Sequence, residues 1–312
     1  MKALIRKAKE DGRSRNGIPA SKLPTSERQA ADGPVERPLP LPAALAPVGE
    51  QHRIGNVPSV WLVEEWLPME VEAQLLENLR ARSGDFIQLR GKRTARFGGD
   101  PGPPFNPEPL PEWLEQICSA LEGAVGHECN AARGPNHVLV NRYQPGEGIM
   151  PHTDGPAYDP RAAILALGSA TVFDFWRDHA HAAGNEGPSA LSLLLPPRSL
   201  LVFADEAYGA HLHGIAARRY DELDEDVVNW TADSRQRWDP NSVEAPDWVR
   251  RQIEGSSTRS CGLRREERYS LTCRHVPLSQ AEATAAHLPA VEESLGELPR
   301  GTPVAEPPVV AA

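Results

Sequence analysis

The chain has 312 residues, four cysteines and a formal net charge of −10, and none of its apolar runs approaches the roughly 18 residues needed to span a bilayer. The cysteines show no Cys-x-x-Cys spacing and no secretion signal precedes them, so we expect reduced thiols in a protein of the cytoplasm and nucleus, not a disulfide framework. The acidic residues gather in 220–247 and 279–312, which leaves the rest close to neutral; charge alone neither supports nor excludes a nucleic-acid ligand.

The N-terminal third of the chain predicts an extension followed by a strand and two helices. Residues 1–50 are rich in proline and small polar residues and hold little to bury, so we predict a disordered extension. The folded domain is expected over 51–278, opening with a strand at 60–63. Apolar residues at helical spacing predict helices over 68–82 and 111–125.

The remainder predicts short strands separated by turns, at 138–143, 162–167, 171–176, 190–195, 199–203, 215–217 and 269–275. Helices followed by many short strands indicate an α+β fold in which the strands form a jelly roll. Residues 220–254 lack periodicity and are interpreted as an acidic insertion, and 279–312 as a disordered tail.

A metal site is predicted at His152 and Asp154, because residues two apart on an extended segment point to the same face. Two histidines and one carboxylate leave open coordination positions and suit non-heme Fe(II). A third ligand is expected downstream, at His213 or at His211, which an extended strand places on the same face as His213. Zinc is the alternative metal, although it favours closed sites and no cysteine is near these residues.

A dicarboxylate site is predicted at Arg268 and Arg274, which stand six apart and therefore share one face of a strand. Two guanidinium groups facing one cavity would bind a dicarboxylate, because their geometry matches carboxylates. Asn141 and Tyr143 are expected to add neutral hydrogen bonds, and Ser270 lies between the arginines. Metal ligands followed by such a pair imply an iron enzyme that consumes 2-oxoglutarate.

The order Asn-x-Tyr, His-x-Asp, His-Gly and Arg-x-x-Leu-Thr-x-Arg resembles the AlkB family of Fe(II)/2-oxoglutarate-dependent dioxygenases over about residues 58–277. The segments 136–141, 145–156, 195–202 and 213–217 are most similar to the branch of AlkB homologue 6. This resemblance implies a double-stranded β-helix with N-terminal supporting helices and a nucleotide-recognition lid. It also implies Fe(II), 2-oxoglutarate and dioxygen as cofactor and cosubstrates, with His213 as third ligand.

The expected substrate is an N-alkylated base in RNA or DNA, flipped out of its stack and oxidatively demethylated. The substrate contacts predicted from one basic segment and one nearby tyrosine are Arg90, Lys92, Arg93, Arg96, Phe97 and Tyr158. Pro156 departs from the family, whose repair enzymes carry an acidic residue there. A protein side-chain hydroxylase or demethylase, and a nucleic-acid-binding regulatory protein with little turnover, are the alternatives. We expect a monomer with no membrane association.

Overall fold

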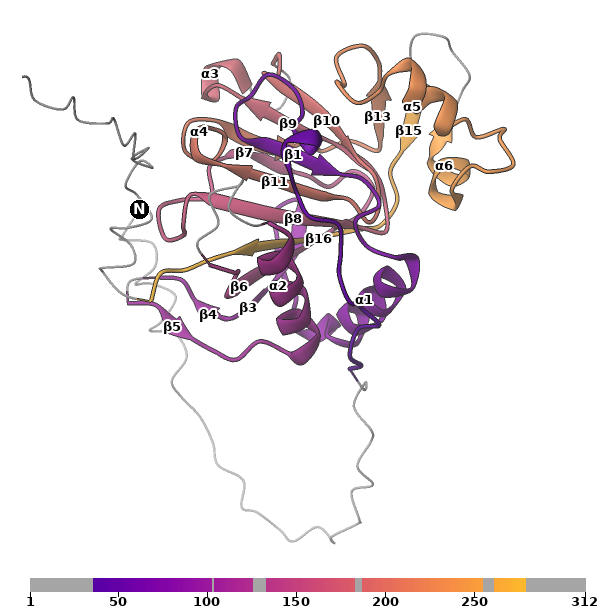
Figure 1. Cartoon of the computed structure of the whole chain (residues 1–312). Helices are drawn as coiled ribbons and strands as arrows, with labels where there is room; N and C mark the ends of the chain where they lie inside the picture. The colour runs from indigo at the N-terminus through magenta and orange to yellow at the C-terminus, as the bar shows by residue number, and fades with distance from the viewer. Residues whose placement is uncertain (1–35, 103, 126–132, 183–186, 255–260, 279–312) are drawn as a thin grey trace, which may run out of the picture. The chain divides into compact units, whose positions relative to one another are not determined.

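The computed structural model describes residues 36–102, 104–125, 133–182, 187–254 and 261–278 (Figure 1). Its larger sheet is built from β1 (Val60–Val63), β2 (Ile87–Leu89), β3 (Lys92–Phe97), β6 (His137–Tyr143), β8 (Arg161–Leu167), β11 (Leu200–Ala204) and β16 (Arg268–Arg274). Its smaller sheet is built from β7 (Ile149–His152), β9 (Thr171–Trp176), β10 (Leu191–Leu195) and β12 (Leu212–Ile215). The strand orders are β1-β11-β8-β16-β6-β3-β2 and β10-β9-β12-β7, with antiparallel pairing throughout.

Side chains alternate along the central strands and divide the core into two layers. On β8, Ala163 and Leu165 join the cluster on the outer face of the larger sheet, whereas Ala162 and Ile164 join the cluster between the two sheets. Phe173 and Phe175 of β9 complete that inner cluster from the smaller sheet. The two facing antiparallel sheets confirm the predicted α+β fold with a jelly-roll core.

Two helices cover the outer face of the larger sheet, α1 (Met69–Ala81) and α2 (Glu112–Ala124) (Figure 1). Both lie within one residue of their predicted bounds. Leu75 of α1 and Ile117 of α2 are fully buried there. These are the supporting helices that the sequence predicts.

Residues 36–50 pack against these helices, so the prediction of disorder over 1–50 is wrong for this part. Leu39 and Val48 are buried in the same cluster as α1 and α2. The Leu39 backbone N–H donates to Gln116 Oε1 at 2.7 Å. These few buried apolar residues lie within a proline-rich segment that has no helical or strand periodicity, so the sequence pattern did not predict that the segment packs. Residues 1–35 and the tail 279–312 lie outside the described residues.

The acidic insertion predicted over 220–254 contains β13 (Tyr220–Leu223), α5 (Ala232–Arg237), α6 (Asp247–Gln252) and β14 (Ile253–Glu254), and β15 (Cys261–Arg264) follows it. The strands form a separate sheet of order β13-β15-β14. Three tryptophans make its core: the rings of Trp230 and Trp238 are stacked at 6.0 Å, and Trp248 meets Trp238 edge-on at 5.4 Å. Buried Arg265 forms an ion pair with buried Asp221 beside this sheet.

The remaining short elements are η1 (Glu50–His52), η2 (Ser83–Asp85), β4 (Gly99–Asp100), β5 (Asn106–Pro107), α3 (His179–Ala182) and α4 (Asp205–Gly209). Six of the seven strands predicted after residue 137 match observed strands within a residue or two, but the strand expected at 215–217 runs from Leu212 to Ile215. Among the described residues, no helix is long and apolar enough to cross a membrane.

Candidate active site

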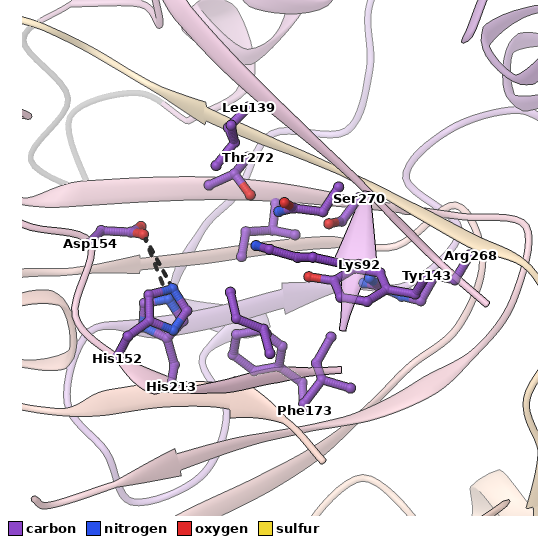
Figure 2. A pocket seen from close by; sticks show the side chains of 14 residues that line it. Lys92, Leu139, Tyr143, His152, Asp154, Phe173, His213, Arg268, Ser270 and Thr272 are labelled. Atoms are coloured by element: carbon purple, nitrogen blue, oxygen red, sulfur yellow. Dashed lines mark ion pairs between the residues drawn. The ribbon is translucent and has the colours of Figure 1, made fainter. Parts of the chain in front are cut away.

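His152, Asp154 and His213 converge at the mouth of the space between the sheets (Figure 2). β7 and β12 are paired so that His152 lies directly opposite His213, and their rings are 4.5 Å apart. One ligand atom from each of the three residues lies within 4.8 Å of the others. Asp154 follows the end of β7, so its carboxylate is presented by a loop and not by the extended strand that the sequence predicts.

Both histidines present Nε2 to the Asp154 carboxylate. Each Nε2 is 3.8 Å from Asp154 Oδ1. His152 Nδ1 lies 2.9 Å from the Met150 carbonyl, which fixes the ring with Nδ1 as donor and Nε2 free to accept a metal. Burial lowers the pKa of His152, and it lowers that of His213 to about 3. Both imidazoles are therefore neutral at neutral pH, as metal ligands must be.

Three aromatic rings fix the orientation of His213. Phe173 is stacked on it at 5.7 Å, and Phe203 and Phe175 lie 4.9 and 6.2 Å away. The alternative ligand His211 lies outside this group, with its Nδ1 3.2 Å from the Glu206 carbonyl. The donor set of two neutral histidines and one carboxylate fits Fe(II) better than a closed zinc site.

Arg274 shares a face of β16 with Arg268, as predicted, but it is bound to Asp154. Its Nη1 lies 2.9 Å from Asp154 Oδ1, and its guanidinium lies over the Tyr158 ring at 4.0 Å. Arg274 does not line the cavity that contains Arg268. Its observed contact holds the metal-binding carboxylate in place, and contact with a cosubstrate stays a prediction.

Arg268 is a buried cation in the lining of this cavity. Its side chain is 3% exposed, and none of its three guanidinium nitrogens has a hydrogen-bond partner within the described residues. Burial lowers the pKa of Arg268 to about 10. The ring of Tyr143 lies 5.7 Å from its guanidinium carbon. A buried unpaired guanidinium is costly, so this group is suited to an anion that binds in the cavity.

The cavity connects Arg268 to the three metal-binding residues (Figure 2). Its lining includes the predicted residues Asn141, Tyr143, Ser270 and Lys92. The Asn141 Oδ1 atom is buried without a partner in the described part of the chain, and burial raises the pKa of Tyr143 to about 12. A neutral phenol and amide beside a cation fit a carboxylate ligand such as one end of 2-oxoglutarate.

The sequence interpretation missed several residues that line this cavity, among them Leu139 and Thr272. Both could have been found by period two, because Leu139 precedes Asn141 by two residues and Thr272 follows Ser270 by two. Phe173 carried no comparable signal, since it lies in a strand whose residues are buried on both faces.

The basic segment predicted to contact substrate is divided between the two faces of β3. Lys92 lines the cavity, whereas Arg93 lies opposite Arg142 on the other face and donates to Gln88 Oε1 at 2.9 Å. Arg96 is exposed and pairs with Asp100 at 3.0 Å. Arg90 is exposed in the turn between β2 and β3.

Phe97 does not have the predicted role of stacking a base. It is 6% exposed and packs edge-on against Trp113 at 6.1 Å, within the cluster beneath α2. The prediction is therefore wrong for Phe97, because β3 turns this side chain into the core beneath α2. Tyr158 lies beside Arg274 and 5.5 Å from the ring of His137, close to the metal-binding residues as predicted.

The chain is similar in sequence to proteins of one known family. The family model described as the 2OG-Fe(II) oxygenase superfamily matches residues 64–274. A protein of Danio rerio named "Probable RNA/DNA demethylase ALKBH6" is 36% identical over 70% of this chain and 86% of its own length. The Mus musculus "tRNA (carboxymethyluridine(34)-5-O)-methyltransferase ALKBH8" is 32% identical over 53% of this chain and 25% of its own. The solved structure of OsALKBH1 aligns at TM-score 0.42 and 16% identity over 70% of this chain and 98% of its own.

Proposed function

We propose that this chain, which belongs to the 2OG-Fe(II) oxygenase superfamily and to its AlkB type, oxidatively demethylates an N-alkylated base in RNA or DNA. The observation that carries the oxygenase chemistry is the buried, unpartnered Arg268 guanidinium in the same cavity as His152, Asp154 and His213. Three metal-binding residues and an unneutralised buried cation in one cavity can bind a metal ion and an anionic cosubstrate side by side.

His152, Asp154 and His213 would hold Fe(II), through two Nε2 atoms and one carboxylate oxygen. The histidines need no deprotonation at neutral pH, because burial lowers the pKa of both. The Asp154 Oδ2 atom is buried without a partner in the described residues, whereas Oδ1 is engaged by Arg274. This leaves one carboxylate oxygen available to a cation.

Arg268 would bind one carboxylate of 2-oxoglutarate, with Tyr143, Ser270 and Asn141 in the lining of the same cavity. A carboxylate bound there would accept charge-assisted hydrogen bonds from the Arg268 guanidinium, which is otherwise buried and unpaired in the described residues. Such bonds are among the strongest hydrogen bonds in proteins. The aromatic residues Phe173, Phe175 and Phe203 keep water from the His213 side of the site.

When bound, Fe(II) with 2-oxoglutarate and dioxygen supplies the oxidant that converts an N-methyl group to N-hydroxymethyl, while 2-oxoglutarate becomes succinate and carbon dioxide. The hydroxymethyl product loses formaldehyde and leaves the demethylated base. The protein residues position the reactants and exclude water.

The choice of nucleic acid as substrate is supported by the relative from Danio rerio, whose name gives RNA and DNA, and by two exposed arginines at the edge of the larger sheet. Arg90 and Arg96 lie on the β2–β3 hairpin, near the cavity that Lys92 enters. Cations there would contact phosphates. This hairpin is our candidate for the nucleotide-recognition lid.

The test is succinate formation by the Fe(II)-loaded protein with methylated and unmethylated RNA and DNA oligonucleotides, beside His152→Ala and Arg268→Ala. We expect one methylated oligonucleotide to stimulate turnover, with loss in both variants. Stimulation by a methylated or lysine-rich peptide, and not by any oligonucleotide, would replace the proposed substrate by a protein side chain. No turnover under any condition would contradict the proposal.

A further inference from the structure

The outer face of the smaller sheet carries a groove beside the acidic insertion. The insertion packs on this face, where Val172 of β9 shares a core cluster with Val227 and Trp230. The Val228 N–H donates to the Ser192 carbonyl at 3.0 Å and ties the insertion to β10. Next to this contact the surface is hollowed over about 670 Å³. Ordinary ligand sites span roughly 300–1,000 Å³, so the groove is large enough to hold a ligand.

Asp174 lies at the floor of this groove. Its strand neighbours Phe173 and Phe175 belong to the cluster between the two sheets. Because side chains alternate along a strand, Asp174 points to the outer face, where it lines the groove. The residue opposite it on β10 is Ser192, which lines the groove as well. Asp174 is only 5% exposed, so the groove has a buried carboxylate in its lining.

Two serines hold one oxygen of this carboxylate. Ser189 Oγ lies 2.7 Å from Ser192 Oγ, and the Ser192 hydroxyl donates to Asp174 Oδ1 at 2.5 Å. Asp174 Oδ2 has no hydrogen-bond partner within the described residues, and the carboxylate forms no ion pair there. Burial raises the pKa of the Asp174 carboxyl, so its charge is costly without a cation beside it. A cation bound at Oδ2 would lower that cost.

The lining of the groove is strongly acidic. Its carboxylates are those of Asp174, Glu222, Asp224 and Asp226. Arg218 is the one basic residue in the described lining, and it already forms an ion pair with Asp221 at 3.3 Å. Four carboxylates against one guanidinium give a formal charge of −3. Such a surface attracts cations and repels the phosphates of a nucleic acid.

The cation that fits this groove is a side chain and not a metal ion. Among the described residues, the three metal-binding residues of the active site are the one group of histidines and carboxylates close enough to share an ion. The groove also has apolar walls, to which Val172, Trp176 and Val227 contribute. Lysine and arginine match both features, because they lay their methylene groups on apolar surface and keep the charge at the tip.

We propose that this groove binds a basic segment of a partner protein, with a lysine or arginine side chain of the segment paired with Asp174 Oδ2. The acidic residues around Asp174 would attract the further cations of the segment. His213 lies on the inner face of the same sheet, so the partner and the substrate would occupy opposite faces. The inference does not depend on the oxygenase function proposed above.

The test is fluorescence anisotropy of the full-length protein with labelled peptides of about twelve residues, in which glycine alternates with lysine or with arginine. Their neutral counterparts carry acetyl-lysine or citrulline instead. We expect one basic peptide to bind, and its neutral counterpart to bind at least about tenfold more weakly. Asp174→Asn should weaken the basic peptide about tenfold, because the charge is lost while the amide keeps the size and the contact with Ser192.

Two further variants separate this contact from general attraction and from a structural role. Asp247→Asn removes an exposed carboxylate outside the groove and should change the affinity by less than about twofold. Ala217 is exposed and lines the groove, so Ala217→Arg adds a cation there without altering a buried group. It should weaken the basic peptide at least about fivefold. Asp174→Asn and Ala217→Arg should both bind Mn(II) like the wild type.

Four results would overturn the inference. The first is that neither basic peptide binds, and the second is that Asp174→Asn and Asp247→Asn weaken binding equally. The third is that Ala217→Arg binds the peptide like the wild type. The fourth is self-association of the wild type that Asp174→Asn abolishes, which would assign the groove to a second copy of this chain. Succinate formation is measured separately, so none of these results decides the proposed oxygenase function.

Discussion

Replacing Arg268 by methionine should make the unliganded protein more stable and abolish its affinity for 2-oxoglutarate. The guanidinium is 3% exposed and unpartnered within the described residues. Its pKa falls from 12.5 to about 10 on folding, which corresponds to about 3 kcal/mol of cost for burying the charge. Because the charged form prevails in both states below the folded pKa of about 10, the whole cost is present at neutral pH.

Methionine keeps the apolar stem but not the charge, so we expect a gain of roughly 1–3 kcal/mol in the free energy of unfolding. The assay is urea denaturation of metal-free protein at pH 7.5, beside calorimetric titration with 2-oxoglutarate after Mn(II) loading. Arg250→Met, at an exposed ion pair with Asp247, is the control and should change stability by less than about 0.5 kcal/mol. A loss of stability above about 1 kcal/mol in Arg268→Met, or unchanged affinity for 2-oxoglutarate, would refute the reasoning.

Three further predictions concern the metal, a buried histidine and a buried ion pair. Saturating Mn(II) should raise the Tm of the wild type by several degrees and leave that of Asp154→Ala unchanged in thermal denaturation, since only the native triad binds the ion. Burial lowers the folded-state pKa of His137 to about 4, below the ordinary 6.5, so the unfolded chain takes up the proton first and stability is lost as pH falls from 6.5 towards 4. His137→Gln should flatten that part of the pH profile in urea titrations, and an unchanged slope would contradict it. Arg265→Met should lower the free energy of unfolding by about 2–3 kcal/mol, because buried Asp221 then keeps the half-exposed Arg218 at 3.3 Å as its ion-pair partner, and a loss below about 1 kcal/mol would show that the pair contributes little.

The central strands and both long helices could be predicted because their burial is regular. On β16, Tyr269, Leu271 and Cys273 enter the outer cluster while the alternate residues face the cavity side, so a period of two predicted both the strand and the shared face of Arg268 and Arg274. The β2–β3 hairpin was not predicted as strands, because an exposed edge strand such as β2 buries no side chain and has no apolar pattern. The insertion was not predicted as structure because its buried residues, among them Trp230, Trp238 and Trp248, are irregularly spaced and form no periodic face.

At the site, the metal-binding residues could be predicted, because their spacing and the order of the motifs can be read directly from the sequence. The partner of Arg274 could not, because the loop that brings Asp154 within 2.9 Å of it is a tertiary feature. For the same reason Phe97 was misassigned: its burial depends on α2 lying beneath β3. Spacing gives the face on which a side chain lies, and packing decides what it meets there.

The most direct test of the central claim is to measure succinate, formaldehyde and the methylated oligonucleotide together in one reaction of the Fe(II)-loaded protein. The account predicts equal amounts of succinate and formaldehyde, with a matching loss of methyl groups by mass spectrometry, and none of the three from His213→Ala. Succinate without any loss of methyl groups, from every methylated RNA and DNA offered, would contradict it.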